Sequence, residues 1–145
     1  MKVVIQRVKK AKLFVEDIEK GEIGKGIVVL LGIGKGDTED KIEYLIKKIL
    51  SLRIFEDEKR KMNYSVSDIK GEVMIVSQFT LYGNCTNGNR PDFTMAEKGE
   101  IAEKIYNKFI EKIKNSSIKV IEGEFGKKMT VEIHNDGPCT IILEE

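Results

Sequence analysis

The segment Gly26-Ile-Val-Val-Leu-Leu-Gly-Ile-Gly34 restricts the fold of this chain more than any other, because it is apolar on both alternations of a β-strand. A strand with one face in water alternates apolar and polar residues. An uninterrupted apolar run is typical of a strand that is covered on both sides. We therefore expect these residues to form a strand buried on both faces.

Two amphipathic helices are predicted from apolar residues at helical spacing. The first spans about residues 38–52, and Asp37-Thr-Glu-Asp40 is expected to supply its N-cap, with acidic residues in the first turn. The second covers residues 101–113. Their apolar faces consist of Ile42, Leu45, Ile46, Ile49 and Leu50 in the first helix, and of Ile101, Ala102, Ile105, Tyr106, Phe109, Ile110 and Ile113 in the second.

The other apolar and β-branched segments predict strands, and the first two of these are expected to be joined tightly. Polar loops are predicted at residues 56–63 and 82–94. The order mixes helices with hairpin-like strand pairs, and no linker or repeat divides the chain, so we expect one α+β domain over residues 1–145. The predicted strands are residues 3–8, 11–16, 53–55, 72–81, 118–122, 129–134 and 139–143.

The composition is that of a folded protein with a strongly charged surface, since 41% of the residues are hydrophobic and 34% are charged. No segment approaches the ~20 apolar residues of a membrane-spanning helix, and the N-terminus carries too many cations for a secretory signal. Cys85 and Cys139 are expected to be reduced, so we expect a cytoplasmic protein. The net charge of +1 argues against extended binding to nucleic acid, DNA included, so any RNA contact should be local.

The glycine pattern Gly32-Ile-Gly-Lys-Gly36 follows a strand and precedes a helix, as phosphate-binding loops do. Its spacing fits neither of the two common glycine motifs. Asp37 also stands at the helix start, where a phosphate would have to lie. We therefore interpret these glycines as turn and packing residues.

The sequence contains few of the residue patterns that hydrolases commonly use for catalysis. The single histidine, His134, lies in a strand pattern without a nearby nucleophile setting, which argues against a histidine-based triad. No His, Cys or Asp residues are spaced as zinc ligands, so we predict no metal. Cys85 lacks a paired base and is interpreted as an inert loop cysteine.

Two polar segments remain that packing alone does not explain. Ser77-Gln-Phe-Thr80 ends a strand that should otherwise be buried, so its polar side chains must be hydrogen-bonded or must face a pocket. Asn135-Asp-Gly-Pro138 lies between two predicted strands, where the residues alone favour a plain tight turn.

In the longer forms Ser77-Gln-Phe-Thr-Leu81 and Asn135-Asp-Gly-Pro-Cys-Thr140, these segments resemble the two signature motifs of the D-aminoacyl-tRNA deacylase family. The resemblance covers essentially the whole chain. Further family landmarks occur in the right order: Gln6-Arg7-Val8, Gly21-Glu-Ile-Gly-Lys-Gly26, Leu52-Arg-Ile-Phe-Glu56, Gly88-Asn-Arg-Pro-Asp-Phe93, and Gly123-Glu-Phe-Gly126 with Met129.

The resemblance implies a homodimeric tRNA-editing hydrolase, with a mixed, mostly antiparallel and barrel-like sheet packed against two main helices. It would cut the ester between the 3′ end of tRNA and a D-amino acid, or glycine, without a cofactor. Gly137 and Pro138, joined by a cis peptide bond, would project into the pocket of the other subunit and obstruct an L side chain. A D side chain would point away into solvent.

Catalysis, as the resemblance implies it, is supplied largely by the 2′-hydroxyl of the terminal adenosine, which helps to activate the attacking water. Ser77, Gln78, Phe79 and Thr80 would form the pocket, with the backbone N–H groups of Phe79 and Thr80 as the expected oxyanion donors. Three alternatives stay open: Thr80 as a covalent nucleophile, a general esterase that uses Thr80 or Cys85, and a non-catalytic RNA-binding dimer module.

Three residues receive supporting roles from the resemblance. Arg7 and Asn135 would hold the Gly-Pro segment, although Arg7 by itself also fits a surface position on a strand. Met129 would line the adenosine pocket, although a methionine in an apolar strand is more often part of the core.

Overall fold

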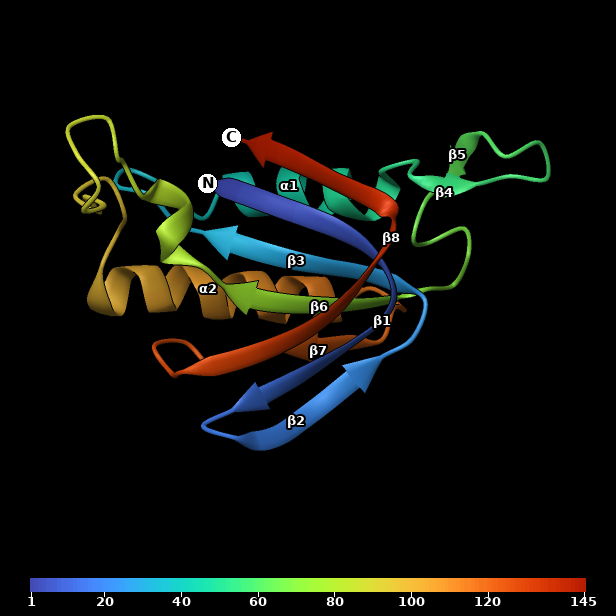
Figure 1. Cartoon of the computed structure of the whole chain (residues 1–145), viewed down its shortest axis with the longest axis horizontal. Coiled ribbons are helices and arrows are strands. Elements are labelled where there is room, and N and C mark those ends of the chain that lie inside the picture. The colour runs from blue at the N-terminus through green and yellow to red at the C-terminus, as the bar shows by residue number, and fades with distance from the viewer.

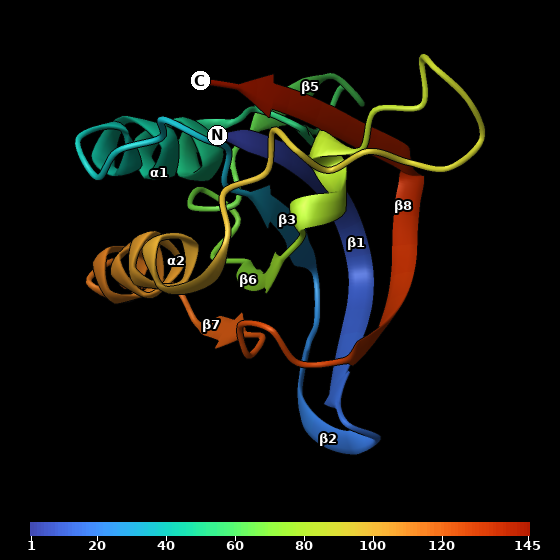
Figure 2. The ribbon, with the colours of Figure 1, turned by 90° about the vertical axis from the view of Figure 1, so that its left-hand side faces the viewer.

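The chain folds into a strongly curved mixed sheet with two helices against one side (Figures 1 and 2), in a computed structural model that describes residues 1–145. The α+β architecture expected from the order of elements is confirmed. In chain order the elements are β1 (Lys2–Val15), β2 (Ile18–Ile23), β3 (Gly26–Gly32), α1 (Lys41–Ser51), β4 (Phe55–Glu56), β5 (Met62–Tyr64), β6 (Glu72–Ser77), the 3-10 helix η1 (Phe79–Tyr82), α2 (Gly99–Lys114), β7 (Val120–Glu122) and β8 (Met129–Glu144).

The strands are ordered β2-β1-β3-β6-β7, and β8 pairs with the other edge of β1. The β3–β6 and β6–β7 pairs are parallel, and the remaining pairs are antiparallel. Along its length β1 pairs first with β3 and then with β2, so it bends away from the helices and carries β8 with it (Figure 2). The sheet consequently encloses a second interior on its far side.

The apolar run forms β3, and its side chains alternate between two separate cores. Ile27, Val29 and Leu31 belong to the large cluster under the helices, whereas Val28 belongs to the smaller cluster on the opposite face. All four are at most 1% exposed. The predicted burial on both faces is confirmed, and it explains why this strand has no polar position.

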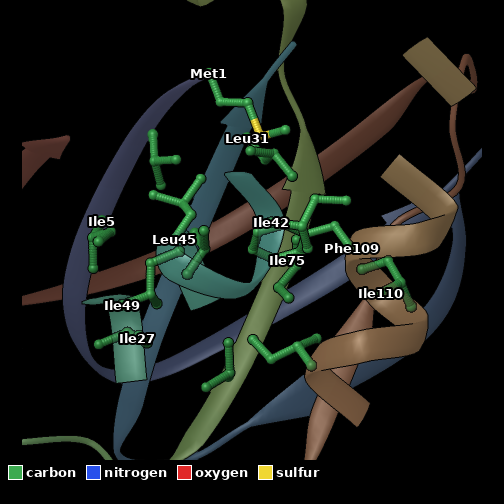
Figure 3. Close-up of a cluster of buried hydrophobic side chains, with 14 of the residues drawn as sticks. Met1, Ile5, Ile27, Leu31, Ile42, Leu45, Ile49, Ile75, Phe109 and Ile110 are labelled. Carbon is green, nitrogen blue, oxygen red and sulfur yellow. The ribbon is translucent and has the colours of Figure 1, made fainter. Parts of the chain in front are cut away.

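Both predicted helices form, and they pack on the same side of the sheet. Figure 3 shows Ile42, Leu45 and Ile49 of α1 against the strand side chains, and Phe109 and Ile110 of α2 on the same cluster. The apolar spacing therefore identified the buried faces correctly. No helix of the protein is both long and apolar enough to span a membrane.

The start of α1 differs from the prediction. The helix begins at Lys41 rather than near Thr38, and its N-cap residue is Asp40, the last residue of the predicted capping segment, whose side chain makes no capping hydrogen bond. The carboxylate of Asp37 instead accepts hydrogen bonds from the backbone N–H of Gly34 and from the α-ammonium group of Met1, each at 2.7 Å. These charge-assisted bonds fasten the end of β3 to the start of β1.

The two strands predicted at residues 3–8 and 11–16 are one strand, β1. Its partner β8 pairs with it from Lys2 to Val15, which keeps the segment extended where no turn residue interrupts it. The turn lies later, at Glu16 and Asp17, whose positive φ values of 48° and 67° suit a two-residue hairpin. That turn leads into β2, which the sequence pattern did not predict.

The tight turn predicted at residues 135–138 is also wrong, because both flanks of this segment pair with the same strand. Gln6 pairs with Thr140, and Val8 pairs with Asn135. Residues 136–139 therefore lie opposite Arg7 alone and form an outward bulge in a continuous β8. We call residues 136–139 the Gly–Pro bulge.

The peptide bond before Pro138 is trans, as are all peptide bonds of the protein, so the expected cis bond is wrong for this structure. Gly137 absorbs the change of direction instead, with a φ of 113° that a residue without a side chain adopts readily.

Candidate active site

Two glycines shape the point at which the chain leaves the sheet after β6. A Cβ atom on Gly32 would lie 3.0 Å from the carbonyl oxygen of Gln78, and one on Gly34 would lie 2.5 Å from the ring of Tyr82. The backbone N–H of Gln78 still donates to the carbonyl of Leu31, at 2.8 Å, before η1 begins. The packing role predicted for these glycines is confirmed, because they make room for η1 against the end of β3.

Polar contacts also hold Tyr82, the last residue of η1, in place. The Tyr82 hydroxyl lies 3.4 Å from a carboxylate oxygen of Asp37, and the Lys2 ammonium lies 5.2 Å from the centre of its ring. Burial, followed by the charge of Asp37, raises the pKa of Tyr82 to about 12. This tyrosine therefore stays neutral and donates toward Asp37 over the whole physiological range.

The geometry of η1 leaves two backbone donors without an acceptor inside the helix. Phe79 and Thr80 are its first two residues, and the N–H groups at the start of a helix have no intrahelical partner. The next N–H, that of Leu81, already donates to the carbonyl of Gln78 at 3.3 Å. Because both Phe79 and Thr80 are exposed, a ligand oxygen can approach their N–H groups from solvent.

The side chains around these donors form no nucleophile–base pair. The side-chain amide nitrogen of Gln78 donates a hydrogen bond to the hydroxyl oxygen of Thr80. His134 is paired with Lys10 of β1 and is exposed on β8. No group of three or more His, Cys, Asp and Glu side chains could hold a metal ion.

A small apolar cavity of about 270 Å³ opens beside Ser77 and Phe79. Hollows of about 520 and 500 Å³ lie elsewhere on the surface, but charged residues predominate in their walls. The smaller cavity is the better candidate for a ligand, since binding sites for small molecules are mostly apolar with a few polar groups. Its walls are Ser77, Phe79, Phe93, Ala96, Glu97, Lys98, Gly99, Phe125 and Gly126.

The loop that carries part of this wall is fastened to the sheet. The N–H of Lys35 donates to the carbonyl of Met95 at 3.0 Å, and the N–H of Glu97 donates to the carbonyl of Ile33 at 2.9 Å. Within the wall, the Phe93 ring packs edge-on against Phe79 at 5.1 Å between centroids. The sequence marks Phe93 and Phe125 only as parts of family landmarks, and local spacing could not predict their place in a pocket.

Arg7 lies under the Gly–Pro bulge and is only 5% exposed. Its Nε donates to the carbonyl of Asp136 at 3.1 Å, and its Nη1 donates to the carbonyl of Ile54 at 2.6 Å. The side-chain amide of Asn135 donates across the base of the bulge, to the carbonyls of Arg7 at 3.4 Å and Cys139 at 3.1 Å. A Cβ at Gly137 would lie 2.3 Å from Nη2 of Arg7, so a side chain there would displace the guanidinium, and the φ of 113° also favours glycine.

The bulge and the η1 donors lie apart within one chain. Arg7 pairs with Ile27 near the start of β3, whereas Ser77 pairs with Leu31 near its end. Four residues of strand correspond to about 13 Å. Figure 1 shows the bend of β8 at one end of the molecule and the short helix after β6 at the other.

Met129, which was expected at the adenosine pocket, is not part of the cavity wall. It begins β8, packs against the smaller core cluster, and places its sulfur over Gly123, where a Cβ would lie 2.6 Å away. Its position in this structure is that of a partly buried core residue.

An apolar patch lies on the outer face of the sheet between the bulge and the end of β3. Val4 of β1 pairs with Leu30 on one side and with Ile142 on the other. Val4 and Leu30 are partly exposed, and Ile142 is 66% exposed. Large apolar side chains that are neighbours on a sheet and open to solvent are typical of an interaction surface.

Solved structures identify the class to which this fold belongs. One described as "Structural Analysis of a probable eukaryotic D-amino acid tRNA deacylase" superimposes with a TM-score of 0.82 at 18% identity, over 98% of this chain and 97% of that one. Another, described as "c-Myc DNA Unwinding Element Binding Protein", gives a TM-score of 0.93 at 46% identity, over 100% and 99%. The protein therefore has the fold of the D-amino acid tRNA deacylases.

Sequence comparison makes the assignment specific. The chain belongs to the D-Tyr-tRNA(Tyr) deacylase family, whose model matches residues 4–144. A D-aminoacyl-tRNA deacylase of Clostridium botulinum (strain Loch Maree / Type A3) is 56% identical over 144 residues, which cover 99% of this chain and 97% of that protein. A D-aminoacyl-tRNA deacylase of Thermosipho melanesiensis is 53% identical with the same coverage. The family resemblance predicted from the two motifs is confirmed.

We predict that Arg7→Lys destabilises the protein by about 2 kcal/mol, because one ammonium group cannot replace the fork that reaches both the Ile54 and Asp136 carbonyls. Urea unfolding monitored by circular dichroism measures the change. Arg53→Lys is the matched control, since Arg53 makes a single exposed bond to the carbonyl of Asn63. Equal stability of the Arg7→Lys variant and the wild type would contradict this role of Arg7.

Proposed function

We propose that this protein hydrolyses the ester bond that joins a D-amino acid, or glycine, to the 3′ end of tRNA. The observation that carries the proposal is the pair of backbone N–H groups at the start of η1, those of the exposed residues Phe79 and Thr80, beside the apolar cavity. Membership of the D-Tyr-tRNA(Tyr) deacylase family supports the choice of substrate.

In the proposed reaction the ester carbonyl lies against the Phe79 and Thr80 N–H groups. Water adds to the carbonyl carbon, and the oxyanion that forms accepts both hydrogen bonds, each worth ~3–4 kcal/mol in related sites. The tetrahedral intermediate then collapses and releases the 3′-oxygen of the tRNA, which takes up a proton. The products are the free amino acid and a tRNA with a free 3′-hydroxyl.

The apolar cavity beside Phe79 suits the terminal adenine, because a planar base can pack among the aromatic side chains of Phe79, Phe93 and Phe125. This placement sets the ribose next to the N–H donors. The 2′-hydroxyl of that ribose, which both donates and accepts hydrogen bonds, then orients the attacking water. The protein positions the substrate and stabilises the oxyanion, a division of roles that fits a site without a nucleophile–base pair.

Each active site, in this proposal, is completed by a second copy of the chain. Gly137 and Pro138 of the Gly–Pro bulge are exposed and the bulge is supported by Arg7, yet it lies about 13 Å along the sheet from Ser77 of its own chain. The apolar patch of Val4, Leu30 and Ile142 lies between the two regions and offers a self-complementary surface for a two-fold dimer. The bulge of one copy can then reach the donors of the other.

A bulge in that position accounts for selection by handedness. Its backbone would stand beside the α-carbon of the bound amino acid and obstruct an L side chain. A D side chain points away from the bulge, and glycine has no side chain to obstruct. Rejection of the wrong substrate by obstruction needs no pocket for any particular side chain.

We predict that the purified protein deacylates D-Tyr-tRNA and Gly-tRNA. It should hydrolyse L-Tyr-tRNA at least about 100-fold more slowly, a difference of roughly 3 kcal/mol in activation free energy. Release of labelled amino acid measures the three rates under identical conditions. Equal rates on the two enantiomers would reject selection by the Gly–Pro bulge, and no hydrolysis of any substrate would favour a non-catalytic RNA-binding module.

A separate prediction concerns the source of the nucleophile. Thr80→Ala keeps the backbone N–H and should retain activity within about 10-fold, whereas a D-Tyr-tRNA that ends in 2′-deoxyadenosine should lose about 100-fold or more. Single-turnover rates make the comparison, with Thr86→Ala as a control on an exposed loop threonine. Loss of activity in the Thr80→Ala variant with a normal rate on the deoxy substrate would indicate a threonine nucleophile.

A further inference from the structure

A short hairpin projects from the body of the protein. It consists of β4, β5 and the turn between them, residues 55–64, and Figure 1 shows it extending beyond the sheet. Its turn carries three consecutive cations, Lys59, Arg60 and Lys61, which we call the basic tip. All three side chains are exposed, and none forms an ion pair with a carboxylate.

The turn is organised by an acidic residue that faces into the hairpin. The carboxylate of Asp57 accepts hydrogen bonds from the backbone N–H groups of Lys59 and Lys61, at 2.8 and 3.0 Å, and from the side chain of Asn63 at 3.2 Å. These bonds, that of Lys61 first, lower the pKa of Asp57 below its ordinary value. Asp57 therefore orders the backbone of the tip and directs its carboxylate inward.

The other two carboxylates of the hairpin are those of Glu56 and Glu58. Glu58 accepts a hydrogen bond from the hydroxyl of Tyr64 at 3.1 Å, and Glu56 lies on β4. Asp57 and Glu58 lie in the turn beside the three cations, but their hydrogen bonds are to backbone N–H groups, to Asn63 and to Tyr64, so the cations stay free to meet a polyanion.

Arg60 occupies a backbone position that favours glycine. Its φ is 58°, in the left-handed region that residues with long side chains adopt rarely. A cation is therefore present at the end of the turn against the local backbone preference.

The root of the hairpin is joined to the Gly–Pro bulge through Arg7. The carbonyl of Ile54, directly before β4, accepts from Nη1 of Arg7 at 2.6 Å, and the carbonyl of Asp136 in the bulge accepts from Nε at 3.1 Å. Arg60 lies six residues after Ile54, so the tip is within about 20 Å of Ile54, whose carbonyl shares Arg7 with the bulge. Wherever the bulge docks, the basic tip lies close by.

We propose that the basic tip of one copy binds phosphates of the tRNA acceptor stem whose 3′ end occupies the active site of the other copy. This inference rests on the proposed function, in which the bulge of the first copy completes that site. A protein with a net charge of +1 needs local cations to hold a polyanion. The basic tip supplies three of them beside the site, without carboxylate partners, on an ordered support.

The test uses two variants of the full-length protein. Arg60→Gly removes one cation and also relieves the left-handed backbone, so a loss of affinity cannot come from weaker folding. Replacement of Lys59, Arg60 and Lys61 by Gln removes all three cations. Lys70→Gly is the matched control, because Lys70 is an exposed lysine with a φ of 51° and no ion pair, outside the hairpin.

Two measurements follow as functions of salt: binding of uncharged tRNA, and kcat/KM for D-Tyr-tRNA. At about 0.1 M salt the triple variant should bind tRNA ~10-fold more weakly than the wild type. The slope of log K for binding against log salt concentration should become shallower by about 2–3. Arg60→Gly should weaken binding ~3-fold and lose about 0.7–0.9 in slope, whereas Lys70→Gly should change neither quantity. Hydrolysis of D-tyrosine esterified to adenosine alone, which has no acceptor stem, should be equal in all variants.

Failure of this inference and failure of the proposed function give different results. If the triple variant binds tRNA like the wild type with the same salt slope, the basic tip does not bind phosphate, whatever the activity. The inference is equally overturned if Lys70→Gly has the same effect as Arg60→Gly. If the wild type hydrolyses neither D-Tyr-tRNA nor the adenosine ester, the proposed function fails, and a lower tRNA affinity of the triple variant would still support the tip.

Discussion

The buried guanidinium of Arg7 is the interaction on which the geometry of this protein depends. A charged group inside a protein is costly unless it is bonded, and Arg7 is bonded to the carbonyls of both Ile54 and Asp136. These bonds join β1, the root of the projecting hairpin and the Gly–Pro bulge into one rigid unit. Because Arg7 occupies the space where a side chain at residue 137 would lie, the same contact also favours glycine in the bulge.

The opposite end of the sheet is organised by β3. Its alternating side chains fill two cores, and its last residues provide the surface on which η1 rests. Gly32 and Gly34 bring Gln78 and Tyr82 close to the sheet, and Asp37 ties Gly34 to the chain start. The N–H groups proposed as oxyanion donors are thus positioned by the packing that buries the central strand. Each chain would hold the N–H donors at one end of the sheet and the Gly–Pro bulge at the other, and a second copy would bring a bulge and a pair of donors together.

Patterns that report burial could be predicted from the sequence, whereas features set by distant partners could not. The uninterrupted apolar run of β3 and the helical spacing of apolar residues in both helices directly reflect which faces are covered. The continuity of β1 and β8 depends on their pairing with each other, so a turn was wrongly predicted at residues 135–138. Ser77–Thr80 could be singled out because polar residues end a buried strand. Their proposed roles, and those of Arg7 and Gly137, came from the family motifs rather than from local physics.

Cross-linking between copies tests the central claim most directly. In a Cys85→Ser background, Phe79→Cys and Pro138→Cys place one thiol at the η1 donors and one on the Gly–Pro bulge. A disulfide requires Cα atoms about 4.4–6.8 Å apart, which these residues can reach only between copies. We predict a covalent dimer upon oxidation that requires both substitutions. A folded double variant whose thiols stay free, or which forms an internal bridge in a monomer, would contradict the completion of each site by a second copy.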